Sequence, residues 1–165
     1  MRHGNLFVIS GPSGAGKGTL VARLLREIPD AWVSMSVTTR KPREGEVDGV
    51  HYRFASPEEF QELVDEDGLL EWATYGGNCY GTPRATVEEH IACGDQVILE
   101  IDVQGGFQVR DKFPSAHLVF IEPPSLDVLE ARLRGRGTET EEAIATRMET
   151  ARVELSRKME YDIRL

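Results

Sequence analysis

A glycine-rich segment near the start of the chain has the residue types and spacing of a phosphate-binding loop. It combines glycines, small residues and a lysine, and reads Gly11-Pro12-Ser13-Gly14-Ala15-Gly16-Lys17-Gly18-Thr19. Glycines let successive main-chain N–H groups point inward around a phosphate, and the N-terminus of a following helix adds partial positive charge. We therefore expect these residues to hold the phosphates of a nucleotide, with the Lys17 ammonium on the β- and γ-phosphates.

The loop departs from the commonest form of this motif at one position. Gly18 stands where a Ser or Thr usually offers a hydroxyl to Mg²⁺, and Thr19 comes one residue later. Direct ligation of Mg²⁺ by the loop is therefore left open. An ordinary Gly-rich turn between a strand and a helix is the alternative interpretation, and the register of Lys17 argues against it.

The segments around the loop predict the elements that would position it. Residues 6–9 form a short apolar run typical of a buried strand, and apolar residues recur at 20, 21, 24, 25 and 28 with helical spacing. Residues 96–102 and 118–121 are further apolar runs, the first of them ending in acids. This alternation predicts an α/β fold of the P-loop NTPase type, with a parallel sheet, helices on both faces and ligands at the carboxyl ends of the strands.

Residues 35–82 differ in character from the segments on either side. After a strand expected over 32–36, turn formers and basic residues dominate 37–49, and a short strand is expected over 51–54. Ser56-Pro57-Glu58-Glu59 has the sequence of a helix start, and two strands are expected on either side of Gly76-Gly77. We therefore expect a small strand-rich insertion over 35–82, between core segments over 1–34 and 83–131.

The last third of the chain predicts two more helices. Ser125 has the position of an N-cap, and a final helix is expected from Thr140 to about Glu160. The residues after it read as the opening of one more strand.

Composition and charge argue against several kinds of partner. The chain has 165 residues and a net charge of −9, which disfavours a nucleic-acid surface or an anionic membrane as the main partner. Its two cysteines, Cys79 and Cys93, form no close pair, which suits a reducing compartment better than a disulfide or a zinc site. No secretory signal or apolar span of membrane length is visible, so we expect a cytoplasmic protein.

Over nearly all its length the chain resembles guanylate kinase, an ATP:GMP phosphotransferase of the P-loop nucleoside-monophosphate kinase family. The segments with the likeness are Gly11-Pro12-Ser13-Gly14-Ala15-Gly16-Lys17, Ser36-Val37-Thr38-Thr39-Arg40-Lys41-Pro42-Arg43-Glu44-Gly45-Glu46, Glu71-Trp72, Tyr80-Gly81-Thr82, Ile101-Asp102-Val103-Gln104-Gly105 and Arg136-Gly137-Thr138-Glu139-Thr140. The first alone would indicate only a nucleotide-binding protein. The second and the last are far more discriminating.

The resemblance implies transfer of the γ-phosphoryl group of MgATP to GMP, giving ADP and GDP, in purine nucleotide recycling. It implies small-molecule substrates, and neither a nucleic acid nor a membrane as partner. It makes 35–82 the GMP-binding insertion, 132–147 a lid and 148–165 a further core segment. Whether the protein is a monomer or a dimer is left open.

The resemblance also assigns the residues that would bind GMP. The family's phosphate binders match Arg40, Arg43, Tyr52 and Tyr80, whose guanidinium and phenol groups are good donors to phosphate oxygens. Its guanine contacts match Ser36, Glu71 and Thr82, and Asp102 matches the acid that faces GMP and the metal region. The Glu71 carboxylate can accept from guanine N1–H and N2–H₂ together, whereas adenine presents an acceptor at N1. The alternative for Arg40 and Arg43 is a solvated basic loop without a ligand. The alternative for Glu71 is an exposed glutamate of a strand.

Catalysis would then consist of positioning and electrostatics, without a general base. The residues that match catalytic positions of the family are Lys17, Arg40, Asp102, Arg132, Arg136 and Arg147, the last three being lid arginines that close over ATP. Arg134 matches no family arginine, and we expect it on the surface. Mg²⁺ is expected to bind through phosphates and water, with Thr19, Glu100 and Asp102 as its candidate contacts; Glu100 stands where the family often has Asp.

The main departure from the family lies at the C-terminal end. The family continues into a final strand, an Asn-Asp segment near the adenine of ATP and a closing helix, whereas this sequence stops as that strand begins. We therefore expect the final strand and helix to be missing from the sequence. Two alternatives compete with guanylate kinase: another small P-loop phosphotransferase, and a non-catalytic scaffold module of the same shape. Glu71 and the stretch from Ser36 to Arg43 argue against the first alternative. Lys17 and the lid arginines argue against the second.

Overall fold

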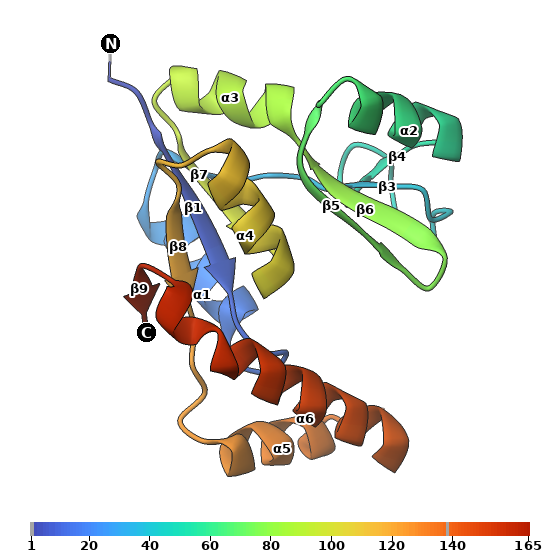
Figure 1. The fold of residues 1–165 in the computed structure, drawn as a ribbon, viewed down its shortest axis with the longest axis vertical. Helices are drawn as coiled ribbons and strands as arrows, with labels where there is room; N and C mark the ends of the chain where they lie inside the picture. Colours follow the sequence, from blue (N-terminus) through green and yellow to red (C-terminus); the bar gives the residue numbers. More distant parts are fainter. Residues whose placement is uncertain (1, 138) are drawn as a thin grey trace.

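A five-stranded parallel sheet forms the centre of the computed structural model, which describes residues 2–137 and 139–165 (Figure 1). Its strand order is β2-β7-β1-β8-β9, and every pair of neighbours is parallel. The strands are β1 (Asn5–Ser10), β2 (Ala31–Val33), β7 (Gln96–Glu100), β8 (His117–Phe120) and β9 (Ile163–Arg164). The predicted parallel α/β architecture is confirmed.

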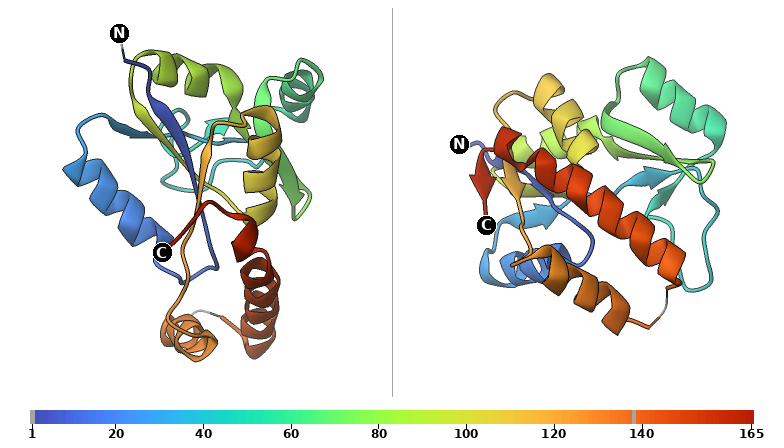
Figure 2. Two further views of the ribbon diagram at one scale, coloured as in Figure 1. Left: turned by 60° about the vertical axis from the view of Figure 1, so that its left-hand side comes forward. Right: turned by 60° about the horizontal axis from the view of Figure 1, so that its bottom comes forward.

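The three inner strands are apolar on both faces because helices cover both sides of the sheet. Figure 2 shows α1 (Lys17–Glu27) on one side and α4 (Val103–Lys112) on the other. The α4 side also packs on α3 (Arg84–Ala92), through the fully buried Val87. Leu25, which its spacing placed on the apolar face of the first helix, is exposed, and α1 buries Val21 instead. An apolar cavity of about 270 Å³ lies between α1 and the sheet.

A smaller, four-stranded sheet is built from the segment that the sequence marked as different. Its order is β4-β3-β6-β5, with β3 (Val37–Thr38), β4 (Arg53–Phe54), β5 (Leu69–Tyr75) and β6 (Asn78–Pro83). Strands β5 and β6 form the predicted hairpin, and both turn residues, Gly76 and Gly77, have the positive φ that a tight hairpin turn requires. Helix α2 (Pro57–Asp65) begins as expected, with the Glu59 N–H donating to the Ser56 hydroxyl over 3.1 Å.

Two predicted strands are shorter in the structure. The strand expected over 32–36 is β2, which ends at Val33 because its pairing with β7 ends there. The strand expected over 51–54 is β4, which begins only at Arg53, where pairing with β3 starts.

Helices α5 (Leu126–Gly135) and α6 (Glu141–Ser156) form an antiparallel pair next to the glycine-rich loop (Figure 1). Ser125 and Thr140 cap them as predicted, and the pair has its own apolar cluster, which includes Leu129, Leu133 and Met148. The last helix was predicted to reach Glu160, but it ends at Ser156 and is followed by a 3₁₀ turn, Lys158–Glu160. Met1 of the predicted core and Thr138 of the predicted lid lie outside the described residues.

No helix in the part of the chain that the structure describes combines the length and apolarity needed to cross a bilayer.

Candidate active site

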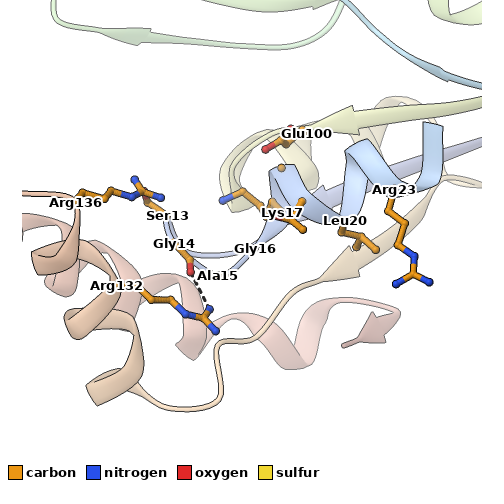
Figure 3. Close-up of a pocket in the computed structure, with 12 residues that line it drawn as sticks. Ser13, Gly14, Ala15, Gly16, Lys17, Leu20, Arg23, Glu100, Arg132 and Arg136 are labelled. Carbon is orange, nitrogen blue, oxygen red and sulfur yellow. Dashed lines mark hydrogen bonds between the residues drawn. The ribbon is translucent and has the colours of Figure 1, made fainter. Parts of the chain in front are cut away.

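The glycine-rich loop borders a cavity of about 880 Å³ at the carboxyl end of β1. Residues 13–20 line it together with Arg23, Glu100, Arg132 and Arg136 (Figure 3). Gly16 has φ 103° and forms the N-cap of α1, so the first N–H groups of that helix face the loop without a side-chain cap among the described residues. Gly11 and Pro12, the first two predicted phosphate contacts, do not line this cavity. The other predicted loop contacts, from Ser13 to Thr19, all do.

Lys17 lies folded against its own loop. Its ammonium donates to the main-chain oxygen of Gly11 and, over 3.3 Å, to that of Pro12. Burial lowers the pKa of Lys17, while the charges of Glu154, Glu100 and Asp102 act in the opposite direction. The ammonium is thus held where anionic oxygens would compete with two carbonyl groups for its hydrogens.

Two arginines from the helical pair contact the loop directly. Arg132 donates from Nη1 to the Gly14 carbonyl over 3.0 Å, which Figure 3 shows as a dashed line. Arg147 donates from Nη1 to the Ser13 hydroxyl over 3.0 Å, and its Nε lies 2.7 Å from Glu139 Oε1. These contacts join residues far apart in the sequence. Arg132 lines the cavity, whereas Arg147 does not line it and contacts only Ser13 of its wall.

The two other arginines of this region, Arg134 and Arg136, differ in their surroundings. Arg136 also lines the cavity (Figure 3). Arg134, which matched no family arginine, pairs instead with Glu130 and Glu141.

A second cavity, of about 280 Å³, lies between the two sheets. Predicted and unpredicted residues line it together: Ser36, Tyr52, Glu71, Ala73, Tyr75, Tyr80, Glu100, Ile101 and Asp102. Five of the predicted GMP contacts therefore line the same cavity. Glu100 lines both this cavity and the loop cavity. The two hollows are neighbours.

Glu71 is the buried acid of the second cavity, with 7% of its surface exposed. Thr82 donates its hydroxyl to Glu71 Oε1 over 2.7 Å. Burial raises the pKa of Glu71 to about 7; the Thr82 hydrogen bond opposes this shift and the nearby charge of Asp102 adds to it. Thr82 itself is buried and does not line the cavity, so it acts on Glu71.

Arg40 and Arg43 do not line this cavity, although Arg40 lies next to Tyr52, which does. The Arg40 fork is paired with both oxygens of Glu46, at 2.8 and 2.9 Å, and its guanidinium lies 5.3 Å from the centre of the Tyr52 ring. The hydrogen bond to Glu46 is the main reason that the pKa of Arg40 is raised, and the same bond lowers the pKa of Glu46 to about 2. Arg43 contributes its main-chain N–H to Glu46 over 2.7 Å.

The sequence interpretation missed three acidic or phenolic groups of the site. Glu46 orients Arg40, Tyr75 donates its hydroxyl to Asp102 Oδ2, and Glu154 of α6 faces Lys17 and Asp102. Burial raises the pKa of Glu154 to about 7, with Lys17 opposing the shift. Tyr75 could have been found, because period-2 alternation places it on the strand face of Glu71. No local pattern marks Glu154.

The described residues contain no group of three or more His, Cys, Asp or Glu side chains arranged to hold a metal ion. Thr19 and Glu100 nevertheless offer oxygen atoms at the wall of the loop cavity, and Asp102 offers oxygen atoms at the wall of the neighbouring second cavity. Mg²⁺ usually keeps several waters and binds through one or two carboxylates plus substrate phosphates. These residues therefore fit a hydrated Mg²⁺ that arrives with a nucleotide.

The chain matches known proteins over nearly its whole length. The family model described as guanylate kinase matches residues 3–165. The chain is 57% identical to a guanylate kinase of Parasynechococcus marenigrum, over 96% of this chain and 87% of that protein. It is 54% identical to one of Desulfitobacterium hafniense, over 97% of this chain and 80% of that protein. The crystal structure of guanylate kinase from Anaplasma phagocytophilum superposes with a TM-score of 0.73 at 33% identity, covering 99% of this chain and 77% of that one.

Proposed function

The chain belongs to the guanylate kinase family and is a phosphotransferase of that kind, and we propose that it transfers the γ-phosphoryl group of MgATP to GMP where its two cavities meet. The observation that supports this site most strongly is Glu100, which lines the loop cavity and the Glu71 cavity alike. A donor phosphate in the first and an acceptor phosphate at the edge of the second would be neighbours.

The ATP phosphates are assigned to the loop cavity. The N–H groups of residues 13–19 and the N-terminus of α1 supply donors and positive charge. Lys17 exchanges its carbonyl partners for phosphate oxygens, which are stronger acceptors because they are charged. Arg132, Arg136 and Arg147 approach from the helical pair, and Gly11 and Pro12 shape the loop from behind. Mg²⁺, when bound, neutralises phosphate charge, with Thr19, Glu100 and Asp102 within its surroundings.

GMP is assigned to the second cavity. Ionised Glu71 accepts from guanine N1–H and N2–H₂, Thr82 fixes the orientation of that carboxylate, and Ser36 faces the same space. Adenine would place an acceptor against the carboxylate and leave buried polar groups unpaired, which is a strong basis for rejection. Arg40, Arg43, Tyr52 and Tyr80 then bind the phosphate at the rim.

The chemistry assigned to the protein is positioning and charge stabilisation. Phosphoryl transfer spreads negative charge over the equatorial oxygens, and Lys17 with the three arginines of the helical pair provides positive charge from two sides. Closure of the lid over 132–147 onto the loop would exclude water, which otherwise competes as an acceptor. The insertion over 35–82 and the core segments keep the roles expected from the sequence, and a cytoplasmic location stays a prediction.

A coupled assay on this 165-residue chain tests the proposal. GMP should be phosphorylated faster than AMP, dTMP or CMP at equal concentration, with ATP and Mg²⁺ present. Faster turnover of AMP would contradict the guanine assignment. Calorimetric titration with ATP separates a kinase from a scaffold module of the same shape, since the scaffold should show little ATP binding.

A further inference from the structure

Tyr75 is the last residue of β5, at the tip of the hairpin, and it lines the second cavity. Side chains alternate along a strand, so Glu71, Ala73 and Tyr75 share the face that borders this cavity. The Tyr75 ring lies 6.0 Å from the ring of Tyr80 on the paired strand. Tyr75, which the sequence analysis did not select, therefore lines the cavity on the same strand face as the buried Glu71.

The hydroxyl of Tyr75 connects the two sheets across the cavity. It donates to Asp102 Oδ2, and Asp102 follows β7 of the five-stranded sheet. The other oxygen, Asp102 Oδ1, accepts from the Gly105 N–H over 2.7 Å and so caps α4. Each oxygen of this carboxylate is therefore fixed by a different element, one by a helix of the core and one by the hairpin tip.

Tyr75 acts in this arrangement as a donor. An ordinary phenol has a pKa of about 10, so it carries its proton near neutrality. An ionised carboxylate can only accept, so the Tyr75 hydroxyl is the donor of this bond.

We propose that Tyr75 is a positioning residue of the nucleoside-monophosphate site, which fixes the Asp102 carboxylate in the cavity and fastens the hairpin tip to the core. The inference rests on the proposed function of this cavity as the GMP site. Without the hydroxyl, the tip of the hairpin loses its bond to Asp102, although Gln108 of α4 still pairs with the main chain of Trp72 farther along β5. Asp102 is then held only through the Gly105 N–H. A purine nucleoside monophosphate then has to order these groups as it binds, which weakens its affinity.

The competing interpretation is a half-exposed tyrosine that merely finds a carboxylate within reach. Tyr75 is 54% exposed as a residue, so this interpretation is a serious one. The two differ in what they predict for the ligand. A chance surface contact changes neither GMP affinity nor its coupling to Asp102, whereas a positioning residue changes both.

The test compares Tyr75→Phe, which removes only the hydroxyl, with Thr74→Val as the matched control. Thr74 precedes Tyr75 on the same strand, and its hydroxyl lies 3.6 Å from Cys79 Sγ, away from Asp102. For Tyr75→Phe we expect the GMP Kd, measured by calorimetry, and the KM for GMP to rise about tenfold, the scale of one hydrogen bond to a charged group. The ATP Kd and the kcat should change much less, and Thr74→Val should leave all four values near those of the unmodified protein.

A double-mutant cycle with Asp102→Ala decides whether Tyr75 acts through Asp102. Once the acceptor is absent, adding Tyr75→Phe should cost no further GMP affinity. Additive losses would overturn the proposal, as would a GMP Kd unchanged by Tyr75→Phe. An equal loss of ATP and GMP binding would also overturn it, because that outcome marks general destabilisation, which thermal unfolding would confirm. If the unmodified chain bound no GMP, the proposed function would fail instead.

Discussion

Thr82 Oγ1 lies 2.7 Å from Glu71 Oε1, and the two residues are cross-strand partners of β6 and β5. The threonine satisfies one oxygen of a carboxylate that is otherwise withdrawn from water. Burial therefore dominates, and the pKa of Glu71 rises to about 7. Two predictions depend on this buried pair.

The affinity for a guanine nucleoside should increase with pH, because the ionised form of Glu71 accepts the two guanine donors. With a pKa of about 7, we expect binding about tenfold tighter at about pH 8 than at about pH 6. Guanosine is the better ligand for calorimetry, since it lacks a phosphate that titrates in the same range. Glu71→Gln should remove the pH dependence and weaken binding at the higher pH by roughly 1–3 kcal/mol. An unchanged pH profile in Glu71→Gln would move base recognition to another residue.

The same carboxyl group should make folding stability depend on pH. Its pKa is raised in the folded protein, so the folded state binds more protons than the unfolded chain between pH 4.5 and about 7. The contribution of Glu71 to the free energy of unfolding therefore falls as pH rises through this window, by up to about 3 kcal/mol. Urea unfolding of the unmodified protein and of Glu71→Gln, at several pH values, isolates the term. The free energy of unfolding of the unmodified protein, relative to that of Glu71→Gln, should be lowest at the upper end of this pH window.

Lys17→Ala should reduce turnover and leave GMP binding nearly intact. The ammonium borders the loop cavity and does not line the Glu71 cavity. Loss of one preorganised cation at the transferring phosphate typically lowers kcat about a hundredfold or more. Arg26→Ala, an exposed cation near the end of the same helix, is the control and should behave like the unmodified protein. If GMP binding fell as steeply as kcat, the substitution would have damaged the fold.

Glu46→Gln should weaken the binding of GMP and spare that of guanosine. Glu46 holds the Arg40 fork by two hydrogen bonds and also accepts the Arg43 N–H. Without its charge, Arg40 has to be ordered by the ligand phosphate, and we expect the GMP Kd to rise roughly fivefold. Glu44→Gln changes an exposed glutamate of the same loop and serves as the control. Tighter GMP binding in Glu46→Gln would show that this carboxylate competes with phosphate for Arg40.

Gly106→Ala should destabilise the protein, whereas Gly135→Ala should not. A Cβ atom at Gly106 of α4 would collide with the Tyr161 hydroxyl, and overpacking of this kind costs about 1–3 kcal/mol. A Cβ atom at Gly135, at the end of α5, meets nothing within 4 Å, and alanine there should stabilise the helix by roughly 0.5–1 kcal/mol. Thermal unfolding of both variants checks the contrast, and equal melting temperatures would contradict it.

Local signals predicted most of the fold. The strands β1, β7 and β8 are buried on both faces and therefore read as apolar runs. Ser56 and Ser125 are N-caps whose chemistry is set within one helical turn. The shorter β2 depends instead on where its pairing with β7 ends, which adjacent residues do not encode.

The residues of the candidate site also fall into those that a local motif predicts and those that depend on contacts between distant segments. The loop over 13–19 is a contiguous motif, so its position at the cavity wall followed from the sequence. The contact of Tyr75 with Asp102 joins two sheets, and the charge of Glu154 acts on Lys17 although the two residues are far apart in the sequence. Pairing of Arg40 with Glu46 was equally invisible, since a basic loop with nearby acids looks the same whether its charges are paired or free.

Glu100, the last residue of β7, is a wall residue of both cavities. A phosphoryl group that crosses this shared boundary goes straight from one oxygen to another, through a single displacement at phosphorus. A single displacement inverts the handedness of the atom at which it occurs. ATP made chiral at its γ-phosphorus should therefore yield GDP whose β-phosphorus has the opposite configuration.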